Sequence, residues 1–253
     1  MLRIYIFCSK ENIFHPPMFH QILEQCKDKV VGVAIFPSLK SERFAKRIGR
    51  LIYIDGWHAL LRLAVRALKH FSNCIVNSPP HFFNVEQVFQ NYPIPMDYFP
   101  DPNHQDCIER IKELKTDVIF NNYGRILNKE VLSVAPLGVL NRHTSKLPEF
   151  RGMEPVFHAL LAGQKEIGVT IHRITDEIDA GEVYAQASVP ALPSVWECYR
   201  NTFELGAEVF LEALKNLQQR KFLKVIDPTC SKYYKFPTRE EIMKFRKKGI
   251  RYL

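Results

Sequence analysis

The sequence lacks the features that mark a membrane or secreted protein. It contains no run of about 18 apolar residues, the length that a membrane-spanning helix requires. The N-terminal stretch turns polar after about eight residues, which is too short for a signal peptide. We therefore expect a cytoplasmic protein that has no membrane partner.

The cysteines form neither a disulfide framework nor a metal site. No Cys-x-x-Cys pair occurs, and the scattered positions lack the paired spacing of zinc ligands. Because a cytoplasmic compartment keeps thiols reduced, we predict free thiols and no metal. The cysteines are Cys8, Cys26, Cys74, Cys107, Cys198 and Cys230.

The composition is that of an ordinary globular protein, with 46% hydrophobic and 25% charged residues among 253. This length indicates one large domain, or one domain with a small appendage. Lys and Arg number 35 against 27 Asp and Glu, which gives a formal net charge of +8. Much of the excess lies in residues 40–50 and 244–251, whose partner could be a phosphate-bearing substrate, nucleic acid or only water.

Hydrophobic patterning in the first part of the chain predicts a parallel α/β sheet. Leu2–Phe7 and Val30–Phe36 indicate buried strands, and Pro17–Cys26 between them has helical spacing. The order strand, helix, strand is typical of parallel sheets. Residues 39–71 are again helical in pattern, and Asp55-Gly56 is expected to divide them into two helices.

Residues 74–121 alternate between irregular and regular patterns. Cys74–Val76 indicates a short strand, and the prolines that follow predict mostly loop around one short helical piece over 77–103. Regularity returns with a helix over Gln105–Leu114 and a buried strand over Asp117–Asn121.

The strand Gly138–Asn141 is the most informative one, because ligands of open α/β sheets bind beyond the carboxyl ends of strands. Farther along, Gly168–Arg173 and Glu182–Val189 indicate two more strands. Ser194 is a suitable N-cap for a long amphipathic helix.

Three polar features surround these strand ends. In Asn141-Arg142-His143 the first and third side chains of an extended segment point the same way. Asp179 lies in an acidic loop that Gly181 allows to turn sharply. The loop from Tyr123 to Leu127 follows another strand, and its backbone groups could bind a flat heterocycle.

An amide, an imidazole and a carboxylate suit acyl transfer without a protein nucleophile. Asn141 and a protonated His143 can stabilise an oxyanion when an amine attacks a carbonyl. Asp179 can keep the histidine protonated and manage the protons of the amine. An Asn-x-His pair alone is a weak signal, because a histidine at a strand end is often only a packing group.

The motifs add weight to this interpretation through a resemblance. The stretch NRHTSKLPEFRG, residues 141–152, resembles a motif of the formyltetrahydrofolate-dependent formyltransferase family. The stretch TIHRITDEIDAGEV, residues 170–183, is similar to the second motif of that family. Arg125-Ile126-Leu127, sixteen residues before Asn141, is similar to its pterin loop. The resemblance is strong over about residues 110–190, with an α/β, Rossmann-like, mostly parallel sheet implied.

The resemblance implies roles for individual residues. Asn141 and His143 would polarise the formyl group, and Asp179 would orient His143 and relay protons. The pterin of N10-formyltetrahydrofolate, the co-substrate, would be held by Arg125, Ile126, Leu127, Thr175, Asp176, Glu177 and Ile178. The acceptor would lie near Ser145, Lys146, Arg151 and Glu154, although Lys146 stands where the family usually has an apolar residue. We interpret His158 and His172 as packed structural histidines.

The identity of the amine that accepts the formyl group is less well determined. A purine-pathway enzyme should have a glycine-rich phosphate loop after its first strand, but no glycine precedes Gly32. The residues from 191 onward are too few for the tRNA-binding barrel of methionyl-tRNA formyltransferases, although the basic tail keeps tRNA open. The length resembles stand-alone enzymes that formylate nucleotide-diphosphate amino sugars for surface polysaccharides. A formyltetrahydrofolate hydrolase would use the same three polar residues, whereas a non-catalytic folate binder would not need them.

We expect residues 1–190 to form the catalytic domain. Residues 191–253 would add a helix and a short hairpin, giving an open twisted sheet with a small C-terminal extension. The apolar C-terminal helix and the aromatic segment after it also suggest a homodimer.

Overall fold

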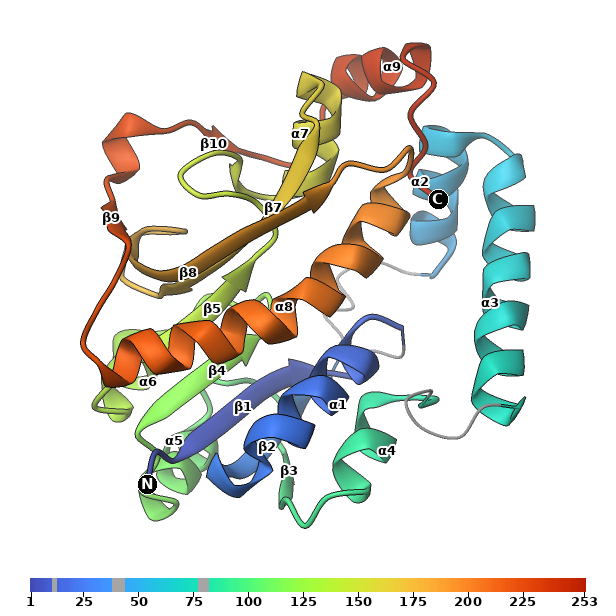
Figure 1. The fold of residues 1–253 in the computed structure, drawn as a ribbon. Coiled ribbons are helices and arrows are strands. Elements are labelled where there is room, and N and C mark those ends of the chain that lie inside the picture. Colours follow the sequence, from blue (N-terminus) through green and yellow to red (C-terminus); the bar gives the residue numbers. More distant parts are fainter. Residues whose placement is uncertain (11–12, 38–43, 77–81) are drawn as a thin grey trace.

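The computed structural model describes residues 1–10, 13–37, 44–76 and 82–253. An eight-stranded sheet forms its centre, in the order β3-β2-β1-β4-β5-β7-β8-β9 (Figure 1). Neighbours from β3 to β5 are parallel, and β7, β8 and β9 each run antiparallel to the preceding strand. The predicted α/β fold with a mostly parallel sheet is therefore confirmed. The strands are β1 Ile4–Ser9, β2 Val30–Phe36, β3 Met96–Tyr98, β4 Val118–Asn122, β5 Val139–His143, β7 Glu166–Arg173, β8 Gly181–Pro190 and β9 Lys224–Ile226.

Helices cover both faces of this sheet because its central strands are apolar on both sides. On β1, Ile4 and Ile6 belong to one core cluster, and Tyr5 and Phe7 to the other. Figure 1 shows α1 and α8 in front of the sheet and α5 and α6 behind it. The covering helices are α1 His15–Cys26, α4 Val85–Gln90 and α8 Val195–Gln218 on one face, and α5 Gln105–Glu113 and α6 Lys129–Val134 on the other.

Two helices at the edge follow β2. Helix α2, Phe44–Asp55, ends at Gly56, whose φ of 74° breaks the helix as predicted. Helix α3, His58–Val76, continues through the residues where we predict a strand, so that prediction is wrong. The helical spacing of Phe71 and Ile75 continues that of the preceding turns, so the helix extends to Val76.

The proline-rich region contains more structure than the sequence indicates. Residues 77–81 of this region lie outside the described part of the chain. Helix α4 is the short helical piece that we predict, with Asn84 as its N-cap. The short strand β3 between Pro95 and Pro100 was not predicted. Among the described residues it pairs with β2 alone, and such an edge position tolerates flanking prolines.

The C-terminal region differs from the expected hairpin. Strand β9 extends the main sheet beside β8, while β10, Tyr233–Tyr234, pairs with β6, Arg151–Gly152. These two segments therefore find partners in the body of the chain and not in each other. The partner of β10 is the loop after β5, whose Met153 N–H also donates to the Tyr234 carbonyl at 2.8 Å.

Helix α8 begins at the predicted N-cap, because the Ser194 side chain accepts a hydrogen bond from the Glu197 N–H. Its apolar side lies in the main core and includes Phe203, Phe210 and Leu214. The helix face from which we predict a homodimer is thus buried within this chain. Helices α7, Pro155–Ala162, and α9, Arg239–Lys247, share a third cluster with Phe157 and Phe245, whose rings stack at 4.3 Å.

Candidate active site

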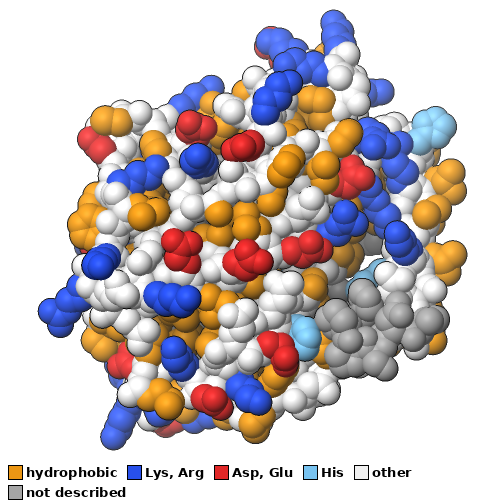
Figure 2. All heavy atoms as spheres, viewed as in Figure 1, with side chains coloured by type: hydrophobic (Ala, Val, Ile, Leu, Met, Phe, Trp, Pro, Cys, Tyr) orange, Lys and Arg blue, Asp and Glu red, His pale blue; other side chains and the backbone are white. Residues whose placement is uncertain are grey.

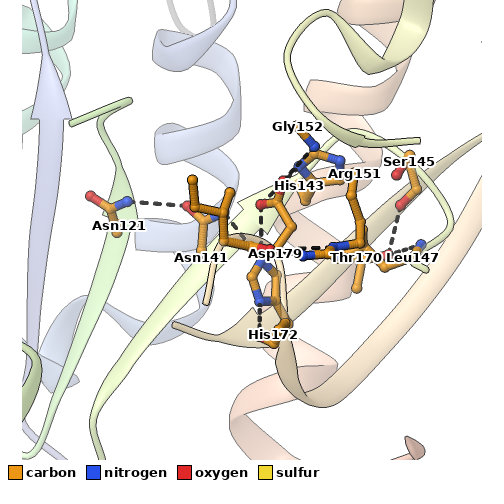
Figure 3. A network of polar contacts seen from close by, with 12 residues as sticks. Asn121, Asn141, His143, Ser145, Leu147, Arg151, Gly152, Thr170, His172 and Asp179 are labelled. Carbon is orange, nitrogen blue, oxygen red and sulfur yellow. Dashed lines mark hydrogen bonds and ion pairs between the residues drawn. The ribbon is translucent and has the colours of Figure 1, made fainter. Parts of the chain in front are cut away.

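Polar side chains gather where β4 and β5 end, next to the antiparallel strand β7. Asn121 on β4 lies opposite Asn141 on β5, and Asn141 lies opposite His172 on β7. His143, two residues beyond Asn141, lies opposite Thr170. The period of two in each strand therefore puts these side chains on one face (Figure 3).

Asp179 comes to the same place from the loop between β7 and β8. Its backbone is left-handed, with a φ of 50°, and Gly181 at 98° completes the turn back into β8. One carboxylate oxygen lies 3.4 Å from Nδ1 of His143, and the other accepts the Gly152 N–H at 2.7 Å. Figure 3 shows Asp179 between Asn141, His143 and Gly152, so the three predicted catalytic residues do come together.

His143 is buried and held from both sides. Its Nε2 donates to the carbonyl oxygen of Phe150 at 3.0 Å, while Nδ1 faces Asp179. Phe150 belongs to the loop that follows β5, and its positive φ of 53° aims that carbonyl at the ring. Both ring nitrogens thus face oxygen acceptors, an arrangement that holds the plane of the imidazole in place.

A second polar chain determines the orientation of the Asn141 amide. Nδ1 of His172 donates to the carbonyl oxygen of Ala180 at 3.1 Å, so its Nε2 accepts from Nδ2 of Asn141 at 3.2 Å. Burial lowers the pKa of His172, which keeps this ring neutral as the arrangement requires. On the other side, Nδ2 of Asn121 donates to Oδ1 of Asn141 at 3.1 Å.

Asn121 is itself fixed by backbone groups. Its Nδ2 donates to the Tyr123 carbonyl at 3.1 Å, and its Oδ1 accepts the Tyr123 N–H at 3.3 Å. The amide nitrogen and oxygen of Asn121 are thereby distinguished, and through Asn121 those of Asn141 also.

Sequence reasoning missed Asn121 and assigned His172 only a packing role. His172 is 1% exposed, as a packed histidine would be, yet it also bonds to the candidate catalytic amide. The strand period contained a usable signal, since Asn121 lies one residue before the end of β4 and Asn141 lies two residues before the end of β5. What it could not indicate was the pairing of β5 with β7.

The residues predicted to contact the acceptor have different environments. Ser145 is buried and donates to the Glu149 carbonyl at 2.6 Å, while Lys146 is exposed. Glu154 accepts a hydrogen bond from the Tyr252 hydroxyl at 2.9 Å. Arg151 is buried, and its guanidinium donates to the carbonyls of Ile178 and Pro228.

Arg151 is therefore a link between segments in this structure. Its bonds join the loop after β5, the acidic loop and the C-terminal region. The charge of a guanidinium is compatible with such burial because several carbonyl oxygens receive its donors. A contact between Arg151 and the acceptor stays a prediction.

The two loops predicted to hold a pterin lie near each other. Nζ of Lys129, just after the first loop, is 3.8 Å from the Asp176 carboxylate in the second. Asn103 holds the first loop in shape, because its Nδ2 donates to the Ile126 carbonyl at 3.0 Å and its Oδ1 accepts the Asn128 N–H at 2.8 Å. Each loop also exposes an apolar side chain, that of Ile126 and that of Ile178.

Other residues of these loops make contacts that stabilise the loop conformations. Arg125 pairs with Asp101 at 2.7 Å, and Leu127 is buried in the core behind the sheet. Thr175 accepts the Glu177 N–H at 3.3 Å, which closes the start of the acidic loop.

A family model described as "Formyl transferase" matches residues 81–214, which include all of these strand ends and loops. The chain belongs to the formyl transferase family. The family predicted from the three motifs is thereby confirmed, and with it an enzyme of the formyltransferase type.

Solved structures of formyltransferases share the fold. Glycinamide ribonucleotide transformylase 1 from Symbiobacterium toebii is 18% identical, with a TM-score of 0.60 over 90% of this chain and 95% of that one. The N-formyltransferase from Helicobacter canadensis is also 18% identical, with a TM-score of 0.57 over 97% and 80%. A formyltetrahydrofolate deformylase from Pseudomonas syringae pv. tomato is 20% identical, with a TM-score of 0.56 over 89% and 66%.

Proposed function

We propose that this enzyme transfers the formyl group of N10-formyltetrahydrofolate to a primary amine, with Asn141, His143 and Asp179 as its catalytic residues. The observation that supports this most directly is the approach of the Asp179 carboxylate to His143. Both groups lie beside Asn141, at the sheet edge where α/β proteins bind ligands.

The chemistry follows from these three groups. A neutral amine attacks the formyl carbon. The oxyanion that forms accepts an N–H from Asn141 and lies next to the imidazole ring of His143. Asp179 takes the proton that the amine loses, directly or through water. The bond from the formyl carbon to N10 then breaks, N10 gains a proton, and tetrahydrofolate leaves.

Asn121 and His172 act in this proposal as positioning residues. His172 accepts one hydrogen of the Asn141 amide nitrogen, which leaves the second hydrogen of that nitrogen for the oxyanion. Asn121 donates to the amide oxygen of Asn141. This bond opposes a flip of the Asn141 amide that would turn its oxygen, instead of its nitrogen, toward the oxyanion.

The donor is proposed to bind between the loops 125–127 and 175–178. Two structural relatives support this ligand class: the Helicobacter canadensis enzyme is a complex with folinic acid, and the sugar 3N-formyltransferase WlaRD was crystallised with 5-N-formyl-THF. Ile126 and Ile178 offer apolar side chains for the faces of a flat ring. Backbone N–H and C=O groups of the same loops would form hydrogen bonds with the edge of the pterin ring.

The acceptor is proposed to be the amino sugar of a nucleotide-diphosphate sugar. The Helicobacter canadensis relative was crystallised with dTDP-3-aminofucose, and WlaRD with dTDP. A homodimer remains part of this proposal, without a surface assigned to it.

The test is an assay of tetrahydrofolate formation from N10-formyltetrahydrofolate with separate acceptors. We expect turnover with one or more amino sugars linked to dTDP, UDP or GDP, and neither turnover with methionyl-tRNA nor formate release when the amine is omitted. Turnover with tRNA alone would contradict the acceptor. Equal formate release with and without amines would identify a hydrolase like the Pseudomonas syringae relative, and no reaction under any condition would refute the whole proposal.

A further inference from the structure

Helix α3 and the turn before it direct large apolar side chains into solvent. Within the part of the chain that the structure describes, six such side chains here are each more than half exposed: Trp57, Leu61, Val65, Leu68, Phe71 and Ile75. On α3 they recur at spacings of three and four, so they form one row along the helix. Figure 1 shows α3 at the outer edge of the molecule, and in Figure 2 hydrophobic side chains stand out along that edge.

The arginines of α3 turn in the opposite direction. Arg62 reaches the Asp55 carboxylate at 3.3 Å, and the Arg66 guanidinium lies 4.9 Å from the centre of the Trp196 ring. An ordinary surface helix buries its apolar side and exposes its charges. These two contacts therefore hold α3 with its arginines toward the protein and its apolar side chains toward solvent.

The segments that contain and adjoin this row are rich in basic residues. Residues 44–76 contain six Lys and Arg against one Asp, and residues 239–253 contain six against two Glu. The remaining residues are balanced, with 23 basic and 24 acidic side chains. We call these two segments together the basic end, and they carry the entire positive excess of the chain.

The two segments of the basic end are joined. The Asp55 carboxylate accepts the N–H groups of Tyr252 and Leu253, each at 2.7 Å. Arg246 on α9 donates to the Tyr53 carbonyl on α2 at 3.4 Å. In Figure 2, Lys and Arg side chains gather inward of the α3 row and at the top of the view, where α9 lies. The C-terminal segment of the basic end therefore packs against α2, which itself lies beside α3 and its apolar row.

We propose that the basic end binds the surface of an anionic lipid bilayer, with α3 lying along the interface. A partner of this surface must offer negative charge and also cover apolar side chains, and anionic lipids do both. Nucleic acid would supply the charge but would leave the row exposed. A second copy of the chain would cover the row but would bring the same positive charge to it.

The dimensions fit a peripheral mode of binding. A helix of 19 residues is about 28 Å long and can lie in the plane of the headgroups. Within residues 1–10, 13–37, 44–76 and 82–253, no helix is long and apolar enough to cross a bilayer. The sequence predicts no membrane partner because it lacks such a span, whereas a peripheral contact does not require one.

The test is flotation of the full-length protein with lipid vesicles. We expect binding to vesicles of phosphatidylcholine with one-third phosphatidylglycerol, weakening at high salt, and none to pure phosphatidylcholine. The double substitution Leu61→Gln with Leu68→Gln should weaken binding at least about tenfold, because both side chains lose their apolar contact. Phe222→Gln with Leu223→Gln is the matched control, since both residues are exposed and precede β9 at the opposite edge of the sheet.

Charge is tested separately. Lys69→Gln and Lys247→Gln should each weaken binding about fivefold, the loss expected for one cation near an anionic surface. Lys221→Gln, an exposed lysine outside the basic end, should have no effect. In a Trp196→Phe background, the emission of Trp57 should shift to shorter wavelength on anionic vesicles, which shows that this end inserts.

Several outcomes would overturn the inference. One is an absence of flotation with anionic vesicles, and another is equal loss of binding in the substituted pair and its control. Light scattering that shows a wild-type dimer and a monomeric Leu61→Gln, Leu68→Gln variant would make α3 an interface between copies. Tighter binding to an RNA duplex than to vesicles, unaffected by the leucine substitutions, would assign the basic end to nucleic acid.

Discussion

At the ends of β4 and β5, polar side chains are buried and bonded to one another, whereas on α3 large apolar side chains face solvent. His143 is 7% exposed and His172 1%, while Leu68 is 70% exposed. Both regions depart from the usual distribution of residue types between core and surface. They do so in opposite directions.

The difference lies in how each departure is compensated. A buried polar group is costly unless it is hydrogen-bonded, and at the active site the partners come from the chain itself. An exposed apolar side chain costs the fold little, but the burial free energy it forgoes remains available to a partner. Substitutions should therefore affect catalysis and folding in the first region and neither in the second.

Asp179→Asn should have the largest effect. Loss of the carboxylate removes the proton acceptor, so kcat should fall about 1,000-fold, within the usual range for general acid–base groups. Affinity for the folate donor should change by less than about twofold, because the proposed pterin contacts come from residues 125–127 and 175–178 and not from the Asp179 carboxylate. Steady-state kinetics and donor titration measure both quantities, and Asp106→Asn, at an exposed aspartate of α5, is the control. A rate within about tenfold of wild type would show that Asp179 is not catalytic.

Thr170→Val should clearly destabilise the fold. The buried Thr170 hydroxyl donates to the Ser145 carbonyl at 2.6 Å and accepts the Leu147 N–H at 3.1 Å. Without it the buried Leu147 N–H has lost this acceptor, and the free energy of unfolding should fall by about 3 kcal/mol. Urea denaturation measures this loss. Ser188→Ala, which removes a surface hydroxyl bonded to Glu166, should cost less than about 0.5 kcal/mol, and equal costs would refute the argument.

Acid should destabilise the protein through its buried histidines. Burial lowers the pKa of His15 to about 3 and also lowers that of His172, whereas in the unfolded chain both lie near 6.5. The unfolded state therefore binds more protons below pH 6.5, and stability is lost as the pH falls from there toward the folded-state values. For each ring, the free energy of unfolding should fall by up to about 1.4 kcal/mol per unit decrease in pH.

Urea denaturation at several pH values between about 7 and 5 measures this slope. His15→Gln should make it shallower, since one titrating ring is removed. A wild-type stability independent of pH in this range would contradict the assignment of neutral rings.

Asn121→Ala should reduce kcat about tenfold while the KM for the donor stays within about twofold. Loss of one orienting hydrogen bond, worth about 1.4 kcal/mol, leaves the Asn141 amide free to turn. Asn216→Ala is a suitable comparison, because it removes a 2.8 Å bond to the Tyr184 carbonyl away from the site. If both variants lost activity only in proportion to their stability, Asn121 would have a structural role alone.

Leu68→Gln should have the smallest effect on folding. Its side chain is mostly exposed, so the free energy of unfolding should change by less than about 0.5 kcal/mol. Leu140→Ala, in the core strand β5, should instead cost about 2 to 5 kcal/mol. Thermal and urea unfolding of the two variants compare these costs. A large loss in Leu68→Gln would mean that the α3 row already has a partner within the chain.

Much of the fold could be predicted because its signals are local. Helix α2 ends at Gly56 as its sequence predicts, since Gly56 is left-handed with a φ of 74°. The alternation of Asn141 and His143 follows from the strand period alone. Contacts of β10 with β6 and of Arg151 with two distant carbonyls could not be predicted, because no local pattern selects the partner of such groups.

Most of the strands and helices, the break at Gly56 and the identity of the candidate polar residues could be obtained from the sequence itself, since propensity, period and capping act over a few residues. Only the tertiary structure decided that Asp179 meets His143, that His172 bonds to Asn141, and that α3 turns its apolar row outward. These outcomes depend on which distant segments pack together. The neighbours of a side chain, and therefore its burial and its chemical environment, are set only when the tertiary structure has formed.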